Sequence, residues 1–439
     1  MVEDQNQDES LGASKSKKVS TEPYKGVRDF YPEDQATQNY MFKVLRQMVE
    51  KVGYVEYGAS ILEPAELYRS KGAENEEIAN EQTYTFTDRG GREVTLRPEM
   101  TPTVARMVAA RRHELGFPLR LYSIPNVFRY ERPQKGRLRE HWQLNVDIFG
   151  SNSPYADAEI LGVAYGIMRS FGAKDSDFEI KVNSRAHLDG FAKEKGLSAE
   201  GYRELLKLLD RKNKIAADEF AKGLSEIGVS SSDFSAKNPP KDIAKMIAEF
   251  KNAGIGNVVY DPTIVRGFDY YTGMVFEVFD TDPTNNRSLF GGGRYDNLTA
   301  LFDTEPIPGV GFGMGDVTLR EFLSSRNLIP PYTPTTQLYL ATTSEDLALQ
   351  VQTLAGKLRR GGINVAVDFG EKKLADQLRM ASKHKIPYLI VVGEDELASG
   401  NFKIKDMASG EETAVTKDSV LSFISQKEKT DTVWPPQGK

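Results

Sequence analysis

The sequence predicts an α+β fold: an antiparallel sheet flanked by helices, with a helical insertion and a separate C-terminal α/β domain. Three observations lead to this prediction. Residues 141–148 alternate polar and apolar side chains, which is typical of a strand with one buried face. Segments between about 184 and 256 repeat apolar residues every three to four positions, which indicates amphipathic helices. Beyond residue 336, apolar strand-like runs alternate with helical patterns, which favours a parallel βαβ arrangement.

Composition suggests where these units begin and end. Residues 1–20 are polar and charged, so we expect a disordered N-terminal tail. Residues 21–330 would form the first domain, and the proline-containing segment 331–335 a linker. The second domain would span residues 336–430, which leaves 431–439 as a tail.

The overall composition excludes several classes of chemistry. The chain has 439 residues, no cysteine and only four scattered histidines, so disulfides, iron–sulfur clusters and thiol catalysis are excluded. The net charge of −6 gives no global attraction for nucleic acid, which would have to bind through local basic patches. No apolar run is long enough to span a bilayer, and the acidic N-terminus does not resemble a secretory signal. We therefore expect a cytoplasmic protein without membrane contact.

The segment 126–149 is predicted to be two strands joined by a long basic loop. Because alternate side chains point to the same side, Arg129 and Glu131 would share one wall with Gln143 and Asp147. The loop adds four cationic residues: Arg132, Lys135, Arg137 and Arg139. Opposed charges beside a cationic loop suit a zwitterionic substrate together with phosphates. The alternative is an ordinary solvated sheet face with charged pairs.

The run FRYERPQKGRLRE within this segment resembles motif 2 of class II aminoacyl-tRNA synthetases, in the form seen in histidyl-tRNA synthetases. A second run, RGFDYY at 266–271, resembles a motif peculiar to that family. A long helix expected from Pro32, followed by a strand over 54–62, resembles motif 1, which forms the family's dimer interface. The basic second domain resembles the anticodon-binding domain of this subgroup. Together these resemblances cover about residues 24 to 428.

The resemblance implies the reaction and its components. Histidine and ATP would form histidyl-adenylate and pyrophosphate, and the histidyl group would then pass to the 3′ end of tRNA(His). ATP would bring Mg²⁺, whose protein ligands the sequence does not identify. The partners would be histidine, tRNA(His) and a second copy of the chain.

The resemblance also implies a role for each matching residue. Two arginines would stabilise charge on the reacting α-phosphate: Arg129 and Arg266. ATP would be bound by Arg129, Glu131, Arg137, Gly311 and Gly313. Histidine would be bound by Glu99, Thr101, Gln143, Asp147, Tyr270 and Tyr271. The tRNA acceptor end would meet Arg132 and Gln134.

Two of these regions are expected to be strand-to-helix corners. Thr101 precedes Pro102, so Thr101 is predicted to be a helix N-cap as well as a ligand. The run GFGMGD at 311–316 resembles motif 3 in position, and Asp316 is predicted to cap the next helix. Alternating glycines there suit an adenine lying against the sheet.

One position departs from the family pattern. Many class II enzymes have an arginine shortly after the motif 3 strand, and that arginine stacks on adenine. This chain has Thr318 there, and Arg320 would point elsewhere on the helix. Either another cation covers the adenine or the motif 2 arginines hold ATP.

Three other functions fit the sequence less well. A non-catalytic histidine-binding paralogue, like the regulatory subunit of ATP phosphoribosyltransferase, would lack the C-terminal domain and alter the RGFDYY run, but both are intact. A synthetase for proline, threonine or glycine would have no use for an acidic–tyrosine imidazole pocket. A nucleic-acid binding module without activity would not need the ATP-type arginines.

Overall fold

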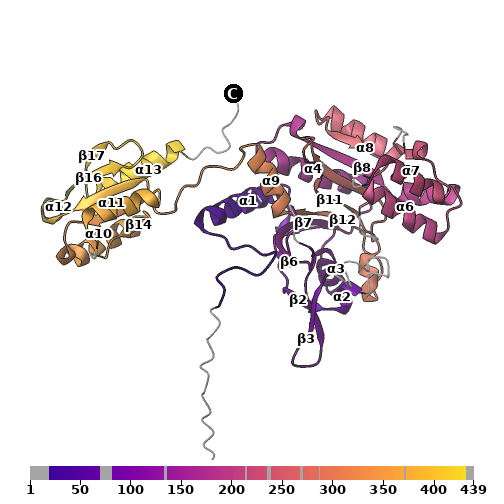
Figure 1. The fold of residues 1–439 in the computed structure, drawn as a ribbon, viewed down its shortest axis with the longest axis horizontal. Coiled ribbons are helices and arrows are strands. Elements are labelled where there is room, and N and C mark those ends of the chain that lie inside the picture. The colour runs from indigo at the N-terminus through magenta and orange to yellow at the C-terminus, as the bar shows by residue number, and fades with distance from the viewer. Residues whose placement is uncertain are drawn as a thin grey trace, which may run out of the picture.

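The computed structural model describes residues 19–69, 82–132, 136–212, 215–234, 239–266, 270–285, 287–369 and 372–431. These residues form two units, each built around its own sheet (Figure 1). The predicted tails at 1–20 and 431–439, and Gln134 of the basic loop, lie wholly or almost wholly outside the described residues. Among the residues described, no helix is long and apolar enough to cross a membrane.

The first unit holds most of the elements. Its helices are α1 (Pro32–Lys51), α2 (Glu66–Arg69), α3 (Thr101–Ala110), α4 (Pro154–Ser170), α5 (Arg185–Glu194), α6 (Ala199–Arg211), α7 (Ala217–Glu226), α8 (Lys241–Asn252) and α9 (Asp316–Ser325). Its strands are β1 (Val55–Glu56), β2 (Leu62–Pro64), β3 (Tyr84–Thr87), β4 (Glu93–Leu96), β5 (Leu119–Ser123), β6 (Asn126–Phe128), β7 (Glu140–Phe149), β8 (Phe178–Ser184), β9 (Val258–Tyr260), β10 (Met274–Asp280), β11 (Ser288–Arg294) and β12 (Gly309–Gly315).

A nine-stranded sheet organises this unit. Its order is β1-β5-β7-β12-β11-β10-β8-β9, and β6 pairs with β7 as the predicted hairpin partner. Neighbouring strands are antiparallel except at the two ends, where β1 runs parallel to β5 and β9 parallel to β8. The α+β fold with an antiparallel sheet is therefore confirmed.

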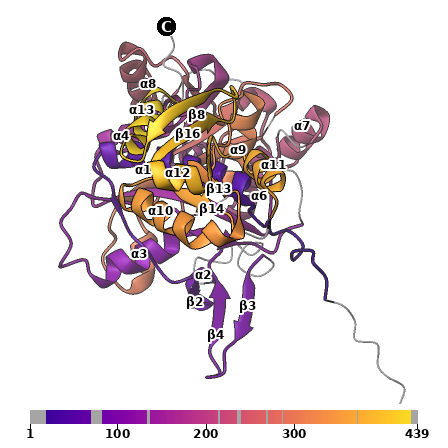
Figure 2. The same cartoon turned by 90° about the vertical axis from the view of Figure 1, so that its left-hand side faces the viewer.

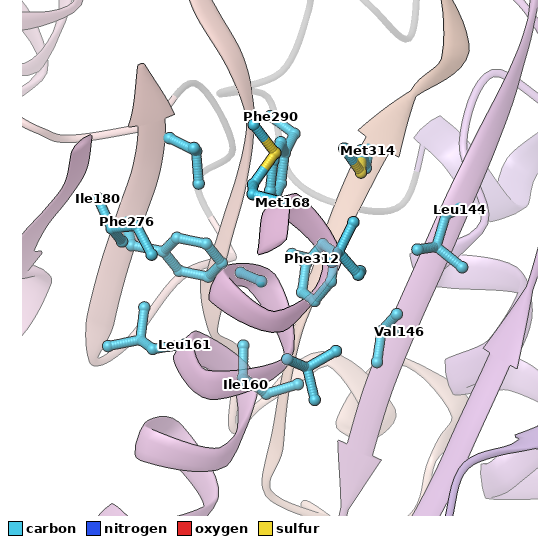
Figure 3. Close-up of a cluster of buried hydrophobic side chains, with 14 of the residues drawn as sticks. Leu144, Val146, Ile160, Leu161, Met168, Ile180, Phe276, Phe290, Phe312 and Met314 are labelled. Atoms are coloured by element: carbon cyan, nitrogen blue, oxygen red, sulfur yellow. The ribbon is translucent and has the colours of Figure 1, made fainter. Parts of the chain in front are cut away.

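One face of the large sheet carries the main hydrophobic core. Strand residues such as Val146, Phe276 and Phe312 meet Ile160 and Leu161 of α4 there (Figure 3). Helices α1, α8 and α9 add side chains to the same cluster. Burying each large apolar side chain stabilises the fold by roughly 1.5–3 kcal/mol. Because this cluster covers the apolar face, the opposite face of the four central strands is left for polar residues.

The strand predicted over 54–62 is wrong. Two short strands replace it, because β1 joins the large sheet while β2 joins a small sheet of order β2-β4-β3. The chain between them turns from one sheet to the other. The Arg97 guanidinium fixes this turn by donating hydrogen bonds to the carbonyls of Ala59 (2.8 Å) and Ser60 (3.2 Å).

The segment between β8 and β9 is helical, as the amphipathic pattern predicts. Helices α5, α6 and α7 share a small core of their own, built on leucines such as Leu205 and Leu224. Helix α8 instead packs against the large sheet through Ile243 and Met246. These helices lie at one end of the first unit (Figure 1).

The C-terminal unit is an α/β sandwich. Its strands are β13 (Leu338–Thr342), β14 (Val365–Val367), β15 (Tyr388–Val392), β16 (Asn401–Asp406) and β17 (Glu412–Thr416). Its helices are α10 (Ala348–Arg360), α11 (Leu374–Lys383), α12 (Glu394–Ser399) and α13 (Ser419–Asp431). Strands β14, β13 and β15 are parallel, and β16 and β17 add an antiparallel edge. Figure 2 shows this unit toward the viewer, with α10 and α11 on either side of β13.

Candidate active site

Glycines form the floor of the polar face of the large sheet. In one row across the strands, Asp147 of β7 lies opposite Gly311 of β12, which lies opposite Gly293 of β11. The next row contains Asn145, Gly313, Gly291 and Glu277. We call this surface, defined by the residues of the two rows, the polar face. Since glycine has no side chain, a flat ligand can lie directly on β11 and β12.

Arg266 lies over this floor from the β10 side. Its guanidinium donates from Nη1 to Glu277 Oε1 at 2.8 Å and from Nη2 to the Gly291 carbonyl at 3.1 Å. Burial opposes the charge, but the carboxylate of Glu277, together with Tyr271 and Tyr270, raises the pKa of Arg266 above its ordinary value. The backbone φ of Arg266 is +56°, a conformation that few side-chain-bearing residues adopt and that is common at functional sites. The cation is therefore fixed beside the glycine floor.

Arg129 reaches the same face from the β6 side. Its Nε donates to the Pro98 carbonyl at 3.0 Å, and its backbone N–H donates to the Arg139 carbonyl at 2.9 Å. The register of β6 on β7 pairs Val127 with His141, so Arg129 shares the side of His141. The two predicted catalytic arginines thus approach one face from opposite sides, and the glycine strands lie between them.

Asp147 is a buried acid beside this floor. Its side chain is 2% exposed, and the hydroxyl of Tyr295 donates a short hydrogen bond to its Oδ1. Burial raises the pKa of Asp147 to about 7. Its Oδ2 has no hydrogen-bond partner among the described residues, so one buried acceptor remains available to a ligand N–H. Tyr295 was not predicted as a site residue, although it directly follows β11, the strand that carries Gly293.

Glu99 and the two tyrosines of the RGFDYY run are joined to Asp147 through Tyr295. The hydroxyl of Tyr270 donates to Glu99 Oε2 at 3.2 Å. Its ring lies 4.9 Å from that of Tyr271 and 5.8 Å from that of Tyr295, measured between centroids. The structure therefore brings the two predicted carboxylates and the tyrosines into one cluster, the Asp147 cluster.

Thr101 is in this cluster but does not cap the helix. Helix α3 begins at Thr101 itself, and its N-cap is Met100, which makes no side-chain cap bond. The predicted N-cap is therefore wrong by one residue. The Thr101 hydroxyl instead hydrogen-bonds to Tyr270, which leaves its backbone at the helix start and its side chain beside Glu99.

Gln143 lies opposite Gly315, one row beyond that of Asn145 and Gly313. Its Nε2 donates to Asn145 Oδ1 at 2.6 Å. A Cβ added at Gly313 would lie 2.4 Å from the same Nε2, so the Gln143 amide covers Gly313. The side chain therefore reaches back over the second row of the polar face.

The basic loop is described on both sides of a gap. Arg137 pairs with Glu131 at 3.3 Å, and the Glu131 side chain is more buried than that of Arg137. Arg132 is exposed, and its predicted companion Gln134 lies outside the described residues. The loop therefore carries an ion pair between Glu131 and Arg137, and an exposed cation at Arg132.

The sequence predicted that Asp316 is the N-cap of α9, and this prediction is wrong. The N-cap is Gly315, and Asp316 is the first helical residue. Its buried carboxylate accepts hydrogen bonds from Arg28 (2.7 Å), Gln38 (3.2 Å) and the Trp142 backbone (3.0 Å). A negative charge in the first helical turn is stabilised by the helix dipole, so Asp316 ties α1, β7 and α9 together.

A metal ion that is held by protein side chains alone needs several ligand groups close together. Within the described ranges, no group of three or more histidines, cysteines, aspartates or glutamates could hold one. Magnesium that accompanies a nucleotide usually keeps several waters and binds through phosphate oxygens, with one or two protein carboxylates. The carboxylate-poor polar face is compatible with that mode and not with a cage of protein ligands.

The raised pKa of Asp147 predicts a pH-dependent stability difference. In the unfolded chain the pKa of Asp147 is about 3.9, so the folded protein binds this proton more tightly than the unfolded chain does. The free energy of unfolding therefore falls as the pH rises from about 4 to about 7. Asp147→Asn removes this ionisation and can still accept from Tyr295. We expect the melting temperature of the variant, relative to that of the parent, to be higher at pH 8 than at pH 5. A constant offset would show that Asp147 ionises normally.

Comparison with known proteins follows the same division of the chain. The sequence model of histidyl-tRNA synthetase matches residues 26–316, and that of an anticodon binding domain matches residues 337–427. The histidine–tRNA ligase of Leptospira biflexa is 42% identical over 436 residues, which covers 94% of this chain and 99% of that protein. The histidine–tRNA ligase of Thermoplasma volcanium is 36% identical over 431 residues, which covers 93% of this chain and 99% of that protein.

Solved structures agree on the fold. The histidyl-tRNA synthetase of Nostoc sp. superposes with a TM-score of 0.78 at 22% identity, covering 93% of this chain and 100% of that chain. The histidyl-tRNA synthetase of S. aureus superposes with a TM-score of 0.73 at 25% identity, and the match covers 92% of this chain and 100% of that chain. The chain therefore belongs to the histidyl-tRNA synthetase family.

Proposed function

We propose that this chain is a histidine–tRNA ligase, which activates histidine with ATP and transfers it to tRNA(His). The observation that carries the proposal is the approach of Arg129 and Arg266 to one glycine-floored face beside the Asp147 cluster. The near-full-length similarity to ligases from two organisms supports it. The regulatory paralogue is not favoured, because the anticodon-binding domain and the two arginines are both present.

In the first step, a carboxylate oxygen of histidine attacks the α-phosphorus of ATP and pyrophosphate leaves. Negative charge builds on the α-phosphate oxygens, so fixed cations that are already in place lower the barrier. Arg129 and Arg266 would supply them from opposite sides. Their planar guanidiniums can contact phosphate and carboxylate oxygens together, which a lysine cannot do. Glu277 would hold Arg266 in its orientation.

Histidine would be recognised by the Asp147 cluster. Asp147 would accept a hydrogen bond from an imidazole N–H, and the tyrosine hydroxyls would surround the ring. Glu99 and Thr101 would bind the α-amino group, and Gln143 would contact the substrate beside Gly313. A site with several buried polar groups rejects a substrate that leaves them unpaired.

The nucleotide would lie on the glycines of both rows of the polar face. Gly311 and Gly313 would let it contact the sheet backbone, and Arg129 would hold the α-phosphate. Arg137, oriented by Glu131, would meet the distal phosphates. Mg²⁺ would bind chiefly through those phosphates and neutralise their charge.

The remaining assignments concern the macromolecules. We propose that residues 336–430 bind the anticodon, that Arg132 and Gln134 meet the acceptor end of tRNA, and that α1 contributes to a homodimer. The division at 331–335 then separates catalysis from anticodon binding, with residues 184–256 inserted in the catalytic domain. Because the proposed reaction charges tRNA, we propose that the protein is located in the cytoplasm.

Histidine-dependent ATP–pyrophosphate exchange, measured without and with tRNA, tests the proposed function. A ligase should exchange without tRNA and charge tRNA(His) when it is added. A chain that binds histidine but gives no exchange would be the regulatory type instead. Exchange driven by proline, threonine or glycine would identify another synthetase.

Arg132→Ala tests the acceptor-end assignment. We expect exchange to remain within twofold of the parent, while tRNA charging slows by about tenfold, because one charged contact to RNA is lost. Arg111→Ala is a matched control, since Arg111 is also exposed but pairs with Glu114 just after α3, outside the basic loop and the second unit. Equal losses of exchange and charging would remove Arg132 from its role.

A further inference from the structure

Thr318 of α9 stands where many class II enzymes have the arginine that stacks on adenine. Its hydroxyl donates to the Leu289 carbonyl at 2.7 Å, so it joins α9 to β11. Arg320 is turned away from the polar face and pairs with Asp34 of α1. The helix itself therefore provides no cation for a base at this end of the sheet.

A ring lies beside the floor at this end. His141 of β7 shares the side of Gln143 and Asn145, because alternate strand residues point to the same face. Its Cδ2 is 3.7 Å from the place where a Cβ at Gly315 would stand. Burial, with the charges of Arg129 and Arg28, lowers the pKa of His141 to about 3. The imidazole is therefore an uncharged ring, suited to stacking against a base.

A cation lies across from Thr318. The basic loop turns back at Gly136, whose φ of +76° favours glycine. A Cβ built at Gly136 would lie 3.3 Å from Arg287 Nη1, 3.8 Å from Thr318 Cγ2 and 3.9 Å from Glu321 Oε2. The guanidinium of Arg287, in the connection just before β11, and the side chain of Thr318 therefore both lie beside Gly136 of the basic loop, although the two residues are distant in sequence. Arg287 is an exposed residue.

We propose that Arg287 supplies the cationic cover of the ATP adenine in place of the missing arginine at 318, and that the His141 ring supports the base from the floor side. The inference rests on the proposed function, because it deepens the ATP site. A guanidinium over an aromatic face is attracted by the ring electrons, and Arg stacks better than Lys. Arg287 and Thr318 together would then do what a single arginine on α9 does elsewhere.

Three variants test the role of Arg287. We expect Arg287→Ala to raise the KM for ATP about 5- to 30-fold, with less than a twofold change in the KM for histidine. Arg287→Lys should recover only part of the loss. The double variant Arg287→Ala/Thr318→Arg should restore ATP binding, because it returns a guanidinium to the same place from α9. Arg92→Ala, in an exposed turn of the small hairpin, is the matched control.

Competition separates the base from the phosphates. If Arg287 covers adenine, Arg287→Ala should weaken inhibition by adenosine as much as it weakens ATP binding, and should leave inhibition by inorganic triphosphate unchanged. Weaker inhibition by triphosphate alone would assign Arg287 to the phosphates and overturn the inference. An unchanged KM for ATP would also overturn it.

His141 has its own test. We expect His141→Phe, which keeps a ring, to retain ATP binding within about threefold, and His141→Leu, of similar size without a ring, to weaken ATP and adenosine together. Equal behaviour of the two would overturn the stacking role. An inactive parent protein would instead contradict the proposed function itself, so the two failures are distinguishable.

Discussion

Arg266→Lys is expected to lower the rate of histidine-dependent ATP–pyrophosphate exchange about 100- to 1,000-fold while histidine binding stays nearly unchanged. Lysine keeps the positive charge and can still pair with Glu277. It cannot contact Glu277, the Gly291 carbonyl and a phosphate oxygen at once, because its ammonium is a single point of charge. The loss should therefore fall on the step in which phosphate charge develops.

Two measurements make this result specific. Histidine affinity by calorimetry should be nearly unchanged, because lysine keeps the positive charge and leaves the Tyr270–Glu99 and Tyr295–Asp147 hydrogen bonds of the Asp147 cluster in place. Melting should shift little, because lysine meets the same backbone strain at φ +56° as arginine does. Arg129→Lys should give a similar loss of exchange from the other side of the floor. Exchange near the parental rate in the Arg266 variant would remove this residue from the chemistry.

The local pattern of the sequence was enough to predict the β7 face. Period-2 alternation put Gln143 and Asp147 on one side, and the register confirms that both face the glycine strands. The glycines at 311–315 were predicted to lie where an adenine could approach the sheet. Their alignment with the glycines of β11 was not predicted, because register depends on long-range pairing and not on one run alone.

The errors also have physical causes. Thr101 and Asp316 both have good capping chemistry, yet each is the first helical residue, and the side chain of each lies among partners from distant parts of the chain. Asp316 accepts from Arg28, almost 290 positions earlier in the chain. Glu277 and Tyr295 were missed as site residues for the same reason. Each acts through a partner, Arg266 or Asp147, that only the folded sheet brings near.

Gly311→Ala is expected to reduce histidine activation by more than about 100-fold and to destabilise the first unit by about 1–3 kcal/mol. A Cβ there would lie 2.4 Å from both Asp147 Oδ1 and the Val146 carbonyl. The carbonyl is backbone, so β12 and β7 must separate locally, and Asp147 of β7 is displaced relative to the glycines of β12. Gly313→Ala is the matched comparison, since its Cβ would meet the movable end of Gln143. Its melting temperature should stay near the parental value, although nucleotide binding weakens. If Gly311→Ala melted and activated histidine like the parent, the glycine floor would not be needed for the substrate.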